Sequence, residues 1–151
     1  MRYAKEAGCK VVFVNYRLAP EHPHPYLDVR NNSESCKKFT DTPMWNSALS
    51  SRIAPMTRAQ RGRADFIYYS PVEAESFEGL PPAYIETAEF DCLHDDGILY
   101  AEKLHEAGIA VTLNETKGTM HGFDIVQNAP TAKTAVRARI AFMKKRFAVD
   151  P

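Results

Sequence analysis

Short strand-like runs and helix-spaced apolar stripes alternate along this chain. Residues 10–16 are β-branched and apolar on both faces, which is typical of a strand buried in a parallel sheet. Residues 83–88 and 109–113 form two further strand-like runs. The pattern therefore predicts three strands, two of them in the second half of the chain.

Helical signals lie between and beyond these runs. One helix is predicted to open at Asp95 or Asp96, where a carboxylate meets the positive end of the helix dipole, and to end at Gly108. Residues 131–148 carry apolar positions at helical spacing, and residues 1–8 predict two helical turns. The order strand, helix, strand, helix requires parallel pairing. The expected fold class is therefore α/β, with a mainly parallel sheet flanked by helices.

The stretch between the first two strands is less regular. The prolines of residues 17–25 predict a fixed loop, because proline disfavours both helix and ladder pairing. Ser33 is the expected N-cap of a short helix. Pro43 is expected in the first turn of a second helix over residues 44–56, and residues 57–80 are expected to be mostly loop.

Length and composition fit one domain with a hydrophobic core, since the 151 residues are 44% hydrophobic. The 19 basic and 19 acidic residues balance, so there is no electrostatic reason to bind nucleic acid or an anionic membrane. No apolar run approaches the ~20 residues that span a bilayer, and the first residues do not form a secretory signal. The three cysteines are widely spaced and include no Cys-x-x-Cys pair. This pattern argues against a disulfide framework and a structural zinc site, and favours a cytoplasmic location.

Two titratable residues follow the second and third predicted strands. Asp91 comes shortly after residues 83–88, and His121 follows residues 109–113 in chain order. If the two strands are neighbours, both side chains emerge at the same edge of the sheet, where sites of open α/β folds gather. A carboxylate that holds one nitrogen of an imidazole is the acid and base half of a Ser-His-Asp triad. The alternative is structural: an aspartate after a strand is often only a turn or helix-cap residue.

A metal site is the other chemistry that the histidines suggest. His22 and His24 flank a proline, and His94 precedes two aspartates with His105 further along. Histidines on either side of a proline need not converge, and the second group is equally compatible with a solvated surface. No metal and no cofactor are predicted.

Three segments carry recognisable motifs. Residues 16–21 read Tyr-Arg-Leu-Ala-Pro-Glu, and residues 80–83 read Leu-Pro-Pro-Ala. The latter lead to Thr-Ala-Glu-Phe-Asp at residues 87–91, and residues 121–123 read His-Gly-Phe. In this order the motifs resemble those of the hormone-sensitive-lipase-like esterases, which have the α/β-hydrolase fold.

That resemblance implies a role for each part of the chain. Asp91 would be the triad acid and His121 the base, acting on short-acyl carboxylic esters as small-molecule substrates. Residues 27–63, approximately, would be a remnant of the helical cap that covers the site in the family. The whole chain, residues 1–151, would then be a single partial α/β-hydrolase domain. Cys92 stands where the family usually has proline.

The family's nucleophile motif, Gly-x-Ser-x-Gly, does not occur in the sequence, and neither does its His-Gly-Gly oxyanion loop. We infer an N-terminal truncation and an internal deletion at about Pro25 and Tyr26. Cys92 lies on the turn of the acid and Ser70 has no flanking glycine, so neither is expected to replace the nucleophile.

These departures lead to an expected esterase-family chain with little activity of its own. The alternatives are a non-catalytic remnant or interaction subunit, and a fragment that arises from the gene model or cloning. Loss of central strands would expose strand edges, which favours self-association or pairing with a complementary chain.

Overall fold

The structure is a computed structural model in which residues 2–9 and 26–147 are described. It divides into two compact units. The central unit comprises Arg17–His121, and the terminal unit combines Met1–Tyr16 with Gly122–Pro151. The predicted strand at residues 10–16 and the proline-rich loop lie outside the described residues. The single-domain organisation stays a prediction.

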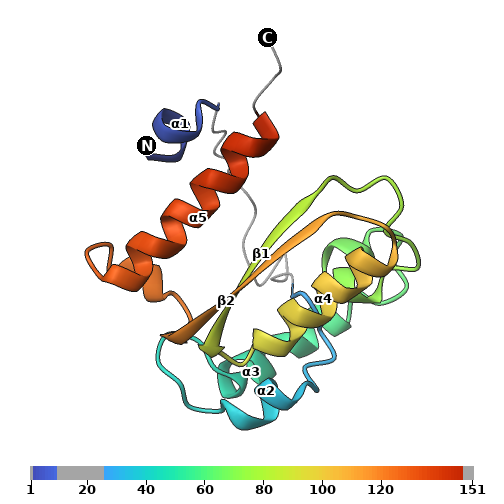
Figure 1. Cartoon of the computed structure of the whole chain (residues 1–151). Coiled ribbons are helices and arrows are strands. Elements are labelled where there is room, and N and C mark those ends of the chain that lie inside the picture. Colours follow the sequence, from blue (N-terminus) through green and yellow to red (C-terminus); the bar gives the residue numbers. More distant parts are fainter. Residues whose placement is uncertain (1, 10–25, 148–151) are drawn as a thin grey trace. The chain divides into compact units, whose positions relative to one another are not determined.

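A parallel pair of strands with a crossover helix forms the centre of the central unit (Figure 1). Strand β1 (Ala83–Phe90) pairs with β2 (Val111–Met120), and helix α4 (His94–Glu106) connects them and packs on them. The predicted strand–helix–strand unit and its parallel pairing are confirmed. The second strand is longer than expected. Residues 114–120 of β2 are mostly polar and did not show a strand pattern in the sequence. They are held in the sheet by backbone pairing with β1.

Helix α4 approaches β1 closely at Gly97. A Cβ atom at this position would lie 2.6 Å from Cγ2 of Thr87 on β1, which is closer than side chains tolerate. Glycine therefore permits the contact between helix and strand. The helix ends as predicted before Gly108, which has a φ of +78°, in the left-handed region that glycine adopts without strain.

Between residues 26 and 80, the structure has two helices and two short 3₁₀ helices. Helix α2 (Glu34–Lys38) follows Ser33 as expected. Helix α3 (Ser47–Arg58) begins later than predicted, because Asn46 is its cap: the Asn46 side chain accepts a hydrogen bond from the backbone N–H of Leu49 at 3.0 Å. Pro43 therefore does not open the helix. Residues 57–80, expected to be mostly loop, contain the last two residues of α3 and two 3₁₀ helices, η1 (Phe66–Tyr68) and η2 (Pro71–Glu73).

A small hydrophobic core holds this part of the chain together. Tyr26, Val29 and Ala54 are buried, and the partly buried side chains of Trp45, Ile53 and Phe66 pack against them. The Tyr26 hydroxyl donates to the carbonyl of Ser50 on α3 at 3.1 Å, which satisfies the polar end of a buried ring.

The terminal unit contains helix α1 (Arg2–Ala7), the 3₁₀ helix η3 (Phe123–Ile125) and helix α5 (Pro130–Phe147). Both predicted helices are confirmed, and Gly8 ends α1 with a φ of +68°. Arg139 on α5 donates to Asp124 Oδ2 at 2.6 Å and to the Tyr3 hydroxyl at 3.1 Å. In the part of the chain that the structure describes, no helix is long and apolar enough to cross a membrane.

Candidate active site

Asp91 and His121 are brought together by the parallel register of the sheet. Phe90 at the end of β1 is paired with Met120 at the end of β2, so the next residue of each strand emerges at the same edge. His121 Nδ1 lies 2.8 Å from Asp91 Oδ2, which is hydrogen-bond distance. The two candidate residues therefore meet, although 30 positions separate them in the sequence.

The Asp91 carboxylate is held at both oxygens. Oδ1 accepts the backbone N–H of Leu93 at 3.0 Å, and Oδ2 faces His121. The Asp91 carbonyl also accepts the N–H of His94 at 3.1 Å, which starts helix α4. The Asp91 side chain is only 10% exposed. A nearly buried carboxylate with fixed oxygens can orient an imidazole with little reorganisation.

His121 is more accessible than its partner, with 39% of its side chain exposed. When Nδ1 donates its proton to Asp91, Nε2 is the basic atom of the ring. The Trp45 ring lies against His121, with 6.2 Å between the ring centroids and 37° between the planes. This arrangement can take up a proton and stabilise the resulting imidazolium through the carboxylate.

Cys92 is not suited to act as a nucleophile. Its side chain is fully buried, and burial together with the neighbouring charge of Asp91 raises the pKa of the thiol to about 12. The nucleophilic form of cysteine is the thiolate, which is scarcely populated near neutral pH when the pKa is that high.

Ser70 is also unavailable as a nucleophile. It is fully buried, its hydroxyl donates to Glu73 Oε2 at 2.7 Å, and its oxygen accepts the backbone N–H of Val29 at 3.0 Å. The bond from Val29 joins residues 26–30 to the start of η2, so Ser70 has a structural role.

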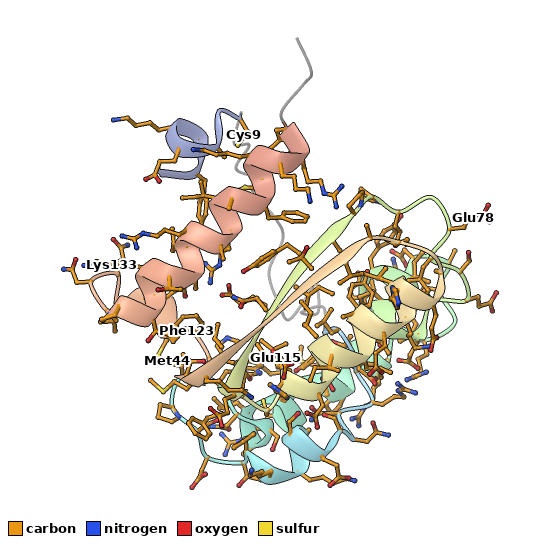
Figure 2. All side chains as sticks on the ribbon, in the orientation of Figure 1. Cys9, Met44, Glu78, Glu115, Phe123 and Lys133 are labelled. Carbon is orange, nitrogen blue, oxygen red and sulfur yellow. The ribbon has the colours of Figure 1, made fainter. Side chains whose placement is uncertain are left out.

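The histidine and carboxylate group at the start of α4 forms a cluster of polar contacts. His94 Nδ1 lies 2.8 Å from Asp95 Oδ1, and His94 Nε2 lies 3.5 Å from Oε2 of Glu115, a β2 side chain labelled in Figure 2. His105 is eleven residues further along the same helix, about 16 Å away along its axis. Residues 2–9 and 26–147 contain no group of three or more histidine, cysteine or acidic side chains suited to a metal ion. His22 and His24 lie outside the described residues.

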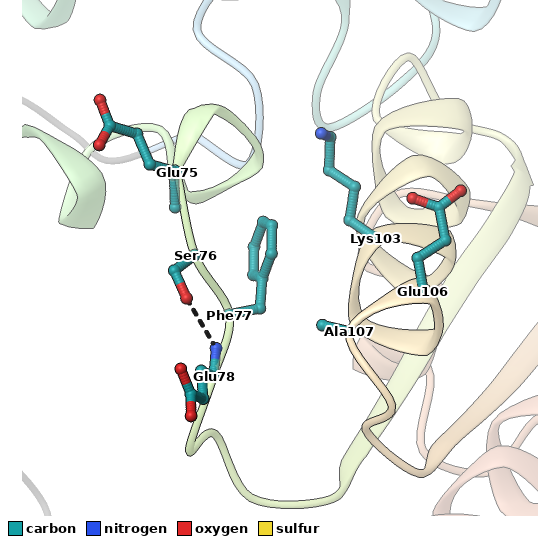
Figure 3. Close-up of a pocket in the computed structure, with 8 residues that line it drawn as sticks. Glu75, Ser76, Phe77, Glu78, Lys103, Glu106 and Ala107 are labelled. Atoms are coloured by element: carbon teal, nitrogen blue, oxygen red, sulfur yellow. Dashed lines mark hydrogen bonds between the residues drawn. The ribbon is translucent and has the colours of Figure 1, made fainter.

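A surface pocket of about 400 Å³ lies away from this pair (Figure 3). Residues 74–78 form one wall, and Lys103, Glu106 and Ala107 of α4 form the other. Asp91 precedes the N-terminal end of α4, whereas the pocket lies at its C-terminal end. The pocket is therefore separate from the acid–base pair.

Two neighbours of the pair were not predicted from the sequence. Trp45 contacts the His121 ring, and Ser35 contacts the turn that follows Asp91. Trp45 is the only tryptophan of the chain, and its position in the segment expected to cover the site could have indicated a place beside His121. Nothing in the local sequence marks Ser35, because its partners lie 57 and 60 residues away.

Comparisons with known proteins identify the fold family. A family model described as the alpha/beta hydrolase fold matches residues 1–28 and 24–125. Esterase LipI of Mycobacterium tuberculosis is 44% identical over 185 residues, covering 81% of this chain and 58% of LipI. Mouse Neutral cholesterol ester hydrolase 1 is 31% identical over 133 residues, covering 80% of this chain and 32% of the relative.

Solved structures of esterases also resemble this chain. A bacterial heroin esterase superposes with a TM-score of 0.73 at 32% identity, covering 83% of this chain and 41% of the esterase. A thermostable esterase from Pseudomonas putida superposes with a TM-score of 0.74 at 30% identity, with the same coverage of 83% and 41%. The chain thus spans between 32% and 58% of the length of these relatives.

Proposed function

Since the chain belongs to the α/β-hydrolase fold family, among its hormone-sensitive-lipase-like esterases, we propose that Asp91 and His121 are the acid and base of its catalytic triad. The reaction class of such a complete triad is hydrolysis of small carboxylic esters. The observation that carries this proposal is the 2.8 Å contact between His121 Nδ1 and Asp91 Oδ2. It is supported by the neighbouring strand ends from which the two side chains emerge.

In this role each residue performs one step of proton handling. His121 takes the proton of an attacking hydroxyl at Nε2 and returns it to the leaving group. The Asp91 carboxylate keeps the proton of the neutral imidazole on Nδ1 and stabilises the imidazolium that forms. Residues 27–63 belong to this proposal as the remnant of a cap in a single partial domain.

We further propose that the chain has no nucleophile of its own. Of its seven glycines, only Gly118 and Gly122 have the spacing of the nucleophile elbow, and the residue between them is Met120. The family model matches in two segments that meet at residues 24–28. The matched region of LipI, at 185 residues, is longer than this entire chain. Both observations support an internal block of missing sequence at about Pro25 and Tyr26.

Negligible esterase activity follows from that absence. Without serine and oxyanion loop, the covalent route and its charge stabilisation are both lost. The test is hydrolysis of a short-chain p-nitrophenyl ester by the purified chain, with His121→Ala as the matched control. We expect equal rates for both proteins, no faster than buffer. Turnover that disappears in the variant would show that an unrecognised nucleophile is present.

The second candidate is a non-catalytic remnant or interaction subunit, or a fragment produced by the gene model. The two-segment family match is as compatible with this second candidate as with the first. Apolar side chains on the strands support pairing with a second copy or a complementary chain, since Phe90, Leu113 and Met120 are 44%, 38% and 37% exposed. Sequencing the genomic DNA across the codons of Pro25 and Tyr26 separates a natural deletion from an artefact. The three cysteines are free thiols, which supports a reducing compartment such as the cytoplasm.

A further inference from the structure

Ser35 joins helix α2 to the turn that carries Asp91. Its hydroxyl donates to the carbonyl of Cys92 at 3.0 Å and accepts the backbone N–H of Asp95 at 3.1 Å. Its own backbone N–H donates to Asp95 Oδ2 at 2.7 Å. Ser35 is buried, with 4% of its surface exposed. Three hydrogen bonds in a buried location therefore connect two segments that are distant in the sequence.

These bonds act on both sides of the turn that sets the direction of the Asp91 side chain. Asp91 itself is held by Leu93 and His94 on its own turn and by His121 at the end of the neighbouring strand. Cys92 occupies a position where proline would restrict φ, so the chain here lacks that covalent restraint. The contact of Ser35 with the Cys92 carbonyl supplies a restraint from another part of the fold.

Asp95 is suited to be the second half of this connection. Burial acts to raise its pKa, but the hydrogen bonds from His94 and from Ser35 outweigh burial and lower it. The carboxylate that receives the Ser35 N–H therefore stays charged, and hydrogen bonds to charged acceptors are stronger than neutral ones.

We propose that Ser35 is a positioning residue that holds the Cys92–Asp95 turn so that Asp91 stays against His121. The proposal rests on the assignment of Asp91 and His121 as the acid–base pair. Ser35 acts through the turn and does not itself touch the reacting atoms. Its loss weakens the electrostatic coupling between the carboxylate and the imidazole.

The chain contains its own reporter of that coupling. Trp45 is the only tryptophan, and its ring centroid lies 6.2 Å from that of His121. A protonated imidazole quenches indole fluorescence at contact distance, so a pH titration of Trp45 emission reports the protonation of His121. His121→Gln identifies the part of the signal that comes from this histidine, and the readout requires no catalytic activity.

The experiment compares the midpoint of this titration in the wild-type chain, Asp91→Asn, Ser35→Ala and Ser51→Ala. Ser51 is an exposed serine of α3 and provides the matched control. Removing the carboxylate should lower the proton affinity of His121 about tenfold or more, since an adjacent opposite charge shifts such equilibria by one or more pH units. Ser35→Ala should lower the proton affinity of His121 at least twofold, and Ser51→Ala should leave this affinity unchanged.

Each outcome decides between the two proposals. A midpoint lowered by Asp91→Asn and unchanged by Ser35→Ala overturns the role of Ser35 and keeps the acid–base pair. A midpoint unaffected by Asp91→Asn overturns the pair, and with it the role of Ser35. If Ser35→Ala fails to fold, Ser35→Cys fills the same volume with a much weaker hydrogen-bond donor. The lowered midpoint of the Trp45 titration is then expected in Ser35→Cys. An unchanged midpoint in that variant contradicts the proposed role of Ser35.

Discussion

Replacing Asp96 with asparagine should stabilise the central unit at neutral pH. Asp96 is 2% exposed, and its Oδ2 has no hydrogen-bond partner among the described residues. The pKa of this carboxyl is raised to about 6, chiefly by burial and in smaller part by the charges of Asp28 and Asp95. Ser33 and Arg30 act in the opposite direction and are outweighed. The folded protein therefore ionises Asp96 at a cost that the unfolded chain does not bear.

The sign and size of the effect follow from proton linkage. The folded state holds the Asp96 proton more tightly than the unfolded chain does. The contribution of this group to the free energy of unfolding therefore falls as the pH rises from about 4 to about 6, and stays low above that. A pKa increase of roughly two units corresponds to about 3 kcal/mol at pH 7. Asparagine loses the favourable interaction of a carboxylate with the start of α4, about 0.3–1 kcal/mol. The expected net gain is about 2 kcal/mol at pH 7.

Urea unfolding of the wild-type chain and Asp96→Asn at pH 7 and at pH 4 measures this difference. The gain should be present at pH 7 and nearly absent at pH 4, where the wild-type carboxyl is already protonated in the folded state. Asp95→Asn is the matched control: because the pKa of Asp95 is lowered in the folded state, this variant should lose stability at pH 7. Destabilisation by Asp96→Asn at pH 7, or an equal gain at both pH values, would refute the reasoning.

Two further predictions concern packing and thiol burial. Gly97→Ala places a Cβ 2.6 Å from Thr87 Cγ2 and should cost about 1–3 kcal/mol in urea unfolding; an unchanged midpoint would mean that α4 does not pack this closely on β1. In a thiol titration with a chromogenic disulfide reagent, Cys9, which is partly exposed, should react in the folded chain, whereas the buried Cys36 and Cys92 should react only after denaturation. Rapid modification of Cys92 under native conditions, located by peptide mapping, would contradict its buried position.

The sequence predicted the features that depend on local chemistry. The strand–helix–strand order and the meeting of Asp91 with His121 follow from apolar runs, from glycine at a helix end and from parallel pairing. The predicted start of α3 was wrong, because a proline signal and an asparagine cap compete within a few residues. The side chain of Asn46 makes the hydrogen bond that sets the actual start. The polar end of β2 was missed because its strand conformation comes from pairing with β1 across an irregular register near Ala88.

Tertiary connections that do not follow from strand pairing could not be predicted from the sequence. The contacts of Ser35 depend on how α2 packs on α4, and no periodicity encodes such a placement. The same holds for the Trp45 ring beside His121. The raised pKa of Asp96 also depends on burial, whereas the sequence only indicated a carboxylate favoured at a helix start.

The most direct test of the account is labelling of the purified chain with a fluorophosphonate, which reacts covalently only with an activated serine. An active serine esterase serves as the positive control, and His121→Ala as the matched variant. Intact mass measurement and peptide mapping should find no adduct on any serine of the chain, in wild type or variant. An adduct on a serine of the wild-type chain that is absent from His121→Ala would contradict the account, because it would show a complete triad.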